Sequence, residues 1–112
     1  MRINIKNIDQ VTVVEMTGEL DSTTAPAVQN QILPLAQDNR HIVLDMSGTL
    51  YMSSAGLRTL LLLYRQISSG SGRIVLAGLS DEIKDTMNIT GFLNFFRIYD
   101  TVALATEALK SS

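Results

Sequence analysis

Apolar and polar residues follow two patterns along the chain, and these patterns predict the first four strands. Ile3 and Ile5 alternate with polar residues and Val11–Met16 is rich in β-branched residues, so these two segments predict a β-hairpin. His41–Met46 and Arg73–Leu79 are almost continuously apolar. Such runs are typical of strands that are buried on both faces of a sheet.

Apolar residues at helical spacing predict four helices between and after these strands. The first helix spans about 25–37 and the second about 54–68. A third helix can begin after Ser80, which is a good N-cap residue, and can end at Gly91. A short strand at 96–99 and a terminal helix are expected to complete the order.

Turn-forming and capping residues separate these elements. Gly18–Asp21 is expected to leave the sheet before the first helix. The N-cap candidates of that helix are Ser22, Thr23 and Thr24. Pro34 is expected to kink this helix or to end its regular part. The charged segment 38–40 is expected to be a loop, and Asp100 or Thr101 is expected to cap the last helix.

The element order β-β-α-β-α-β-α-β-α predicts an α/β fold with one central mixed sheet. About five strands and about four helices are expected, with an N-terminal hairpin and a largely parallel remainder. At 112 residues the chain has the length of one domain, which we expect to span 1–112.

Composition and charge exclude several classes of function. The formal net charge of -2 provides no basic footprint, so nucleic-acid binding is not expected. The chain has no cysteine and a single histidine, His41, which excludes disulfides, thiolate metal sites and histidine clusters. No cofactor is expected. No signal peptide and no membrane-spanning run is found, so we expect a cytoplasmic protein without membrane insertion.

Enzyme motifs are also missing from the sequence. It contains no nucleophile elbow, dinucleotide-binding loop, Walker loop or zinc-protease helix. Asp21 and Asp45 could be imagined as paired catalytic carboxylates, but Asp21 stands near a helix start and Asp45 ends a predicted strand. These simpler roles explain both residues, and we expect no enzymatic activity.

The segment Asp45–Arg58 combines the most chemical features in the chain. It is predicted to run from a strand through a loop into the second helix, with Ser53 and Ser54 where the helix begins. A helix N-terminus has amide groups without partners and favours anions. A serine there can cap the helix or carry a phosphate, and the local sequence favours the cap. Arg58, one turn further, could neutralise a phosphate, although helical arginines are more often simply solvated.

Three segments of the chain match one family pattern in the same order. They are GELDSTTAP at 18–26, LDMSGTLYMSSAGLR at 44–58, and the run from TGFL to FRIYD at 90–100. Together they resemble the STAS domain, the fold of anti-sigma factor antagonists, over essentially the full chain. The resemblance implies a STAS fold, in agreement with the mixed sheet predicted above.

The resemblance also implies a phosphorylation switch. In this family an antagonist binds an anti-sigma factor that is also a serine kinase, and thereby frees the sigma factor. The kinase phosphorylates a serine at the start of the second helix, and a PP2C-like serine phosphatase removes the phosphate. Ser54 matches that serine, with Ser53 as the alternative. Ser53 replaces the aspartate that usually precedes the phosphorylated serine, and Ala55 replaces the serine or threonine that follows it.

The expected partner surface combines the segment before the first helix with the start of the second. Its candidate residues are Asp21, Ser22, Thr23, Asp45, Ser47, Met52, Ser53, Gly56, Leu57 and Arg58. Asp21 and Asp45 are expected near Ser54, because loops at one end of a sheet lie together. They either position Ser54 or cap backbone groups.

Two other functions remain compatible with the resemblance. STAS domains also occur as non-catalytic subunits of lipid-transporting ABC systems, where no phosphorylation cycle is needed. The same switch could also regulate a target other than a sigma factor.

Three phenylalanines lie within five residues, at Phe92, Phe95 and Phe96. The favoured interpretation is that they close one end of the core, and the alternative is a patch that faces a partner.

Overall fold

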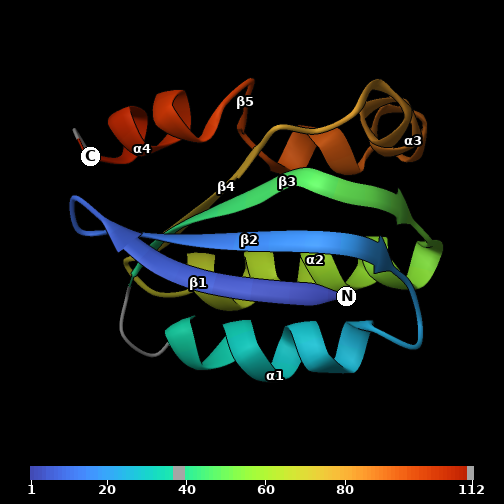
Figure 1. Ribbon diagram of the computed structural model, residues 1–112, viewed down its shortest axis with the longest axis horizontal. Helices are drawn as coiled ribbons and strands as arrows, with labels where there is room; N and C mark the ends of the chain where they lie inside the picture. The colour runs from blue at the N-terminus through green and yellow to red at the C-terminus, as the bar shows by residue number, and fades with distance from the viewer. Residues whose placement is uncertain (37–39, 111–112) are drawn as a thin grey trace.

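The computed structural model describes residues 1–36 and 40–110, which form one five-stranded sheet with helices on both faces (Figure 1). The strands are β1 Arg2–Ile8, β2 Val11–Leu20, β3 His41–Met52, β4 Arg73–Ala77 and β5 Ile98–Tyr99. The helices are α1 Ala25–Ala36, α2 Ser54–Ser68, α3 Asp81–Thr90 and α4 Val102–Lys110, with a 3-10 turn, η1, at Phe92–Phe95. Most of the loop predicted at 38–40 lies outside the described residues.

The spatial order of the strands follows their order in the sequence, β1-β2-β3-β4-β5. β1 pairs with β2 in antiparallel orientation, and the three other pairs are parallel. The predicted mixed sheet with an N-terminal hairpin is therefore confirmed. Parallel neighbours need crossover connections, and α1 and α2 supply them between β2, β3 and β4.

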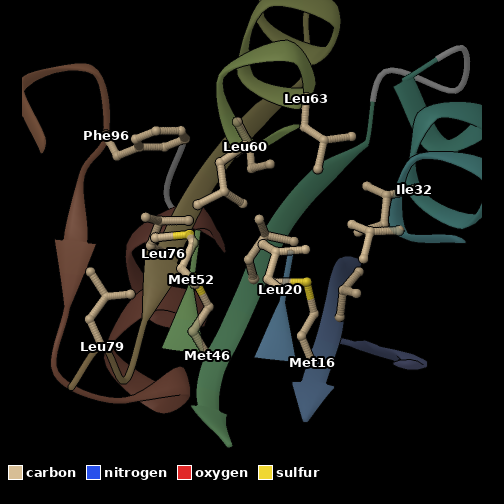
Figure 2. Close-up of a cluster of buried hydrophobic side chains, with 14 of the residues drawn as sticks. Met16, Leu20, Ile32, Met46, Met52, Leu60, Leu63, Leu76, Leu79 and Phe96 are labelled. Atoms are coloured by element: carbon tan, nitrogen blue, oxygen red, sulfur yellow. The ribbon is translucent and has the colours of Figure 1, made fainter. Parts of the chain in front are cut away.

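Each face of the sheet has its own hydrophobic cluster. The larger cluster joins β2, β3 and β4 to α1, α2 and α3, and Figure 2 shows ten of its members labelled between the sheet and the helices. The smaller cluster lies under α4, whose Ala105 and Leu109 pack on Val13, Val43 and Val75. Burial on both faces explains why the sequence of β3 and β4 is apolar without alternation.

Two strands are longer than predicted. β2 continues to Leu20 and β3 continues to Met52, and these two residues are partners in the parallel register. Gly18, Glu19 and Leu20 therefore stay in the sheet, contrary to expectation, and only Asp21 leaves it. The expectation that the segment before Ser53 is a loop is wrong. The register shifts twice along this pair, and Gly18 has a positive φ of 118°. Bulges of this kind interrupt the alternation from which strands are predicted.

The predicted helix ends agree closely with the structure. Ser80 Oγ accepts a hydrogen bond from the Ile83 amide at 3.2 Å, and Gly91 ends α3 in the left-handed conformation with φ 79°. Thr101, of the two candidates, caps α4. Pro34 lies inside α1, two residues before its end at Ala36.

Candidate functional site

Three helices begin at the same end of the sheet, where three parallel strands terminate. β2, β3 and β4 run in the same direction, and α1, α2 and α3 start beyond the ends of these strands (Figure 1). Helix N-termini carry partial positive charge and amide groups that need acceptors. Both serines at the start of α2 lie at this end of the sheet, beyond the C-terminal ends of the parallel strands.

Ser53 is the N-cap of α2. Its backbone is extended, with φ -83° and ψ 176°, and its Oγ accepts a hydrogen bond from the Gly56 amide at 3.3 Å. Its carbonyl accepts another hydrogen bond from the Leu57 amide at 3.0 Å. A serine in this geometry satisfies helix amides that would otherwise lack partners. The capping role that the sequence allowed for either serine belongs to Ser53.

Ser54 is the first residue of α2 and is exposed to solvent. Within the described residues its hydroxyl forms no hydrogen bond, unlike the hydroxyl of Ser53. The first turn of α2 contains no acidic residue, and Arg58 is exposed one turn further along the helix. A negatively charged group attached to the Ser54 oxygen would therefore lie at the positive end of α2.

The start of α2 is held against the end of β2. The Ser53 amide donates a hydrogen bond to the Leu20 carbonyl at 2.9 Å. A Cβ atom built on Gly56 would lie 2.6 Å from that carbonyl oxygen and 2.8 Å from Met52 Cγ, so this approach requires glycine. Because Asp21 follows Leu20 directly, the segments that start α1 and α2 lie side by side.

Asp21 caps the turn that leads into α1. Its Oδ1 accepts hydrogen bonds from the Thr23 hydroxyl at 2.7 Å, the Thr23 amide at 2.9 Å and the Thr24 amide at 3.2 Å. In return, the Asp21 amide donates to Thr24 Oγ1 at 3.0 Å. The cap is therefore Asp21 and not a hydroxyl of Ser22, Thr23 or Thr24, because a carboxylate can accept several donors at once. Of the two roles proposed for Asp21, the structure supports backbone capping.

Asp21→Asn is expected to reduce stability at neutral pH and to remove part of the acid sensitivity of the protein. Hydrogen bonds from the Thr23 hydroxyl and amide hold the pKa of Asp21 below its usual value of 3.8. The ionised group therefore contributes stability that is present above about pH 4 and is lost as the pH falls through the lower folded-state pKa. Urea unfolding at neutral and acidic pH measures this contribution. A difference between wild type and variant that stays constant down to low pH would contradict it.

Asp45 lies far from Ser54, contrary to expectation. It pairs in register with Glu15 and Ala77, and its Oδ1 accepts hydrogen bonds from the Ser47 amide at 3.1 Å and the Ser47 hydroxyl at 2.7 Å. β3 continues for seven residues beyond it, roughly 20 Å at the usual rise of a strand. The expectation failed because the strand does not end at Asp45.

Three of the predicted contact residues are buried. Met52 and Leu57 are 5% and 4% exposed, and Gly56 is buried against Leu20. The Met52 and Leu57 side chains support the start of α2 from inside the core, and Gly56 allows the close approach to Leu20, so direct contact with a partner is not available to these residues. Ser22, Thr23, Ser54 and Arg58 are exposed.

Two exposed apolar residues shortly before Ser53 in the chain were not predicted from the sequence as part of this site. Leu50 is 73% exposed and Tyr51 is 54% exposed, just before Met52 and Ser53. β4 pairs with β3 only as far as Asp45, so within the described chain the end of β3 has no strand on that side. We call the exposed residues Ser22, Thr23, Leu50, Tyr51, Ser54 and Arg58 the Ser54 surface.

Neither a metal centre nor a membrane span is found in residues 1–36 and 40–110. No group of three or more histidine, cysteine or carboxylate side chains comes together there. No helix in these ranges has both the length and the hydropathy needed to cross a bilayer.

Comparisons with known proteins agree on one family. The family model of the STAS domain matches residues 2–105. BtrV of Bordetella bronchiseptica, to which an anti-sigma factor antagonist function is ascribed, is 28% identical over 113 residues, covering 100% of this chain and 97% of that protein.

Two solved structures share the fold. An anti-sigma factor antagonist from Mycobacterium paratuberculosis superimposes with a TM-score of 0.86 at 27% identity, covering 96% of this chain and 92% of that one. The Bacillus protein SpoIIAA in its phosphorylated form has a TM-score of 0.75 at 17% identity, covering 96% and 99%, which supports the fold alone.

Anti-sigma factor antagonists act by binding other proteins and are not catalysts. The expectation that the chain is not an enzyme agrees with this family. The family model spans nearly all of the chain, and the structure superimposes on that of the Mycobacterium paratuberculosis antagonist over almost its whole length. The protein belongs to the STAS domain family, and the relatives described above include anti-sigma factor antagonists.

Proposed function

We propose that the protein is an anti-sigma factor antagonist in a bacterial partner-switching pathway. In the unphosphorylated form it binds an anti-sigma factor that is also a serine kinase. Phosphorylation of Ser54 ends this binding, and a PP2C-like serine phosphatase restores the active form. The protein acts in the cytoplasm through contacts with proteins, without binding nucleic acid or inserting into a membrane.

The observation that carries this proposal is the division of roles between two neighbouring serines. The hydroxyl of Ser53 is half-buried and is used to cap α2, whereas the hydroxyl of Ser54 is exposed. A kinase needs a hydroxyl that is accessible and not already engaged. The Ser54 position therefore suits modification better than the alternative, Ser53. The phosphorylated form of SpoIIAA shows that a protein with this fold can carry the modification.

A phosphate on Ser54 is compatible with the fold. It adds a charge of about -1.5 to -2 at pH 7, and the N-terminus of α2 favours negative charge. The modification should therefore leave the domain folded. Its effect falls on the Ser54 surface, where it adds bulk and repels acidic groups of a bound partner.

The partner contact is proposed to cover the Ser54 surface. Leu50 and Tyr51 provide exposed apolar area four and three residues before the phosphoacceptor in the chain. Interface residues that contribute most to affinity are often aromatic and lie near the centre of a contact. Asp45 and Ser47 lie much further back along β3 and are left out of this contact.

The test is incubation with ATP and the anti-sigma kinase of the same organism, followed by mapping of the phosphorylated residue by mass spectrometry. The wild type and Ser53→Ala should gain one phosphate at Ser54, and Ser54→Ala should gain none. Phosphorylation of Ser54→Ala to the wild-type level would overturn the site assignment. Stable association with an ABC ATPase and with no kinase would favour the transporter alternative instead.

A further inference from the structure

A cavity is lined by residues around the start of β4. β4 begins at the end of the sheet opposite to the start of α2, as Figure 1 shows. The volume of the cavity is about 300 Å³. It is bounded by the end of α2, the first residues of β4 and the segment around η1. The residues that line it are Tyr64, Ser68, Gly72, Arg73, Ile74, Val75, Phe95 and Arg97.

One wall of this cavity is an open strand edge. β5 pairs with β4 only at Leu76 and Ala77, so the first three residues of β4 have no strand neighbour on that side within the described chain. The Leu76 amide donates to the Arg97 carbonyl at 3.0 Å, which shows that its N–H points toward β5. Alternate residues of a strand direct their N–H groups the same way, so the Ile74 amide points toward the cavity. It is a donor available to a ligand.

Positive charge is concentrated around the same cavity. Arg73 and Arg97 both line it, and none of the lining residues is acidic. Arg97 is exposed and forms no ion pair in the described part of the chain. A guanidinium group is planar and offers paired donors to a carboxylate or a phosphate. The cavity therefore suits an oxyanion, although the whole chain has a net charge of -2.

Aromatic rings form the remaining wall. Phe96 is only 7% exposed and lies among the buried side chains near Leu60 and Leu76, as Figure 2 shows, so it closes the core as predicted. Phe95 is 50% exposed, and its ring lies 6.0 Å from that of Tyr64. The phenylalanine cluster therefore divides between the core and the surface. The exposed part faces the cavity and offers apolar area to a ring of a ligand.

We propose that this cavity binds a small oxyanion attached to an aromatic ring, such as an aromatic carboxylate or an aromatic phosphate ester. Arg97 binds the anionic group together with the Ile74 amide, Arg73 adds positive charge to the cavity wall, and Phe95 and Tyr64 contact the ring. A volume of about 300 Å³ is at the small end of ligand cavities, which suits a single-ring molecule. This site is independent of the proposed switch at Ser54.

The test is a titration of ¹⁵N-labelled protein with phenyl phosphate, benzoate and inorganic phosphate, each at millimolar concentration. Phenyl phosphate should produce saturable shifts at the Ile74 and Arg97 amides and should bind several-fold more tightly than inorganic phosphate. Comparison with benzoate tells whether the anion is preferred as a phosphate or as a carboxylate. Absence of saturable shifts with all three probes, or shifts confined to the start of α2, would overturn the proposal.

Variants separate specific binding from general attraction between charges. Arg97→Gln should weaken phenyl phosphate binding by about tenfold, the effect of losing one charge-assisted contact. Arg65→Gln removes the same charge from an exposed position on α2 outside the cavity and should leave the affinity unchanged. Phe95→Ala should weaken phenyl phosphate but not inorganic phosphate. An equal effect of both arginine variants would refute the site, and thermal melting checks that all variants are folded.

Discussion

Gly56→Ala is expected to destabilise the protein by about 3 kcal/mol, a large effect for one methyl group. In an ordinary helix the same change stabilises by about 0.5–1 kcal/mol, because glycine loses more conformational freedom on folding. Here the new Cβ would lie 2.6 Å from the Leu20 carbonyl oxygen and 2.9 Å from Leu20 Cγ. A backbone atom cannot rotate away as a flexible side chain can, so α2 has to shift from the sheet.

Urea unfolding followed by circular dichroism measures the effect of Gly56→Ala. Ser54→Ala is the control in the same helical turn, because it changes an exposed residue and adds no atom to the core. It should alter the free energy of unfolding by no more than about 0.5 kcal/mol. If Gly56→Ala were as stable as the wild type, the close packing of α2 on β2 would not be needed for the fold.

Ser54→Asp is expected to weaken binding of the anti-sigma kinase at least tenfold, about 1.4 kcal/mol, while leaving the melting temperature nearly unchanged. An aspartate supplies one negative charge of the roughly two that a phosphate supplies. At the first position of α2 this charge is favourable for the helix, so stability is preserved. At the Ser54 surface the same charge faces a partner and meets like charge or an apolar contact.

Calorimetric titration of the kinase with Ser54→Asp and Ser54→Asn separates charge from size. Asparagine matches the shape of aspartate without its charge, so Ser54→Asn should lose much less affinity. Equal losses for both variants would mean that bulk alone disrupts the contact. Full affinity of Ser54→Asp, or a large fall in its melting temperature, would count against the switch.

The ends of α3 and the start of α4 could be predicted from the sequence because capping depends on a few neighbouring residues. Ser80, Gly91 and Thr101 all fill their expected positions. The choice between Ser53 and Ser54 could not be made in this way. Both have the same side chain, and a step of one residue along a helix start decides which hydroxyl turns back to the amides and which faces solvent.

Strand ends could not be predicted, because they depend on partners that are distant in the chain. The polar residues near Gly48 resemble a loop in composition, yet they lie in β3 beside β2. Thr49 is 3% exposed, and its hydroxyl donates to the Met16 carbonyl at 2.9 Å, which satisfies a backbone group at the irregular register. Leu50 and Tyr51 are exposed because β4 ends before it could pair with this part of β3. The local sequence pattern does not indicate where β4 ends.

The hydrogen bond between the Ser53 amide and the Leu20 carbonyl has a consequence for substrate recognition. Many protein kinases bind their target serine in a flexible, extended segment that adapts to the active site. Ser54 follows a residue that is bonded to another strand, and it precedes a helix packed closely on that strand. A kinase that modifies it must therefore recognise the shape of the folded domain, and a short peptide with the same residues would lack that shape.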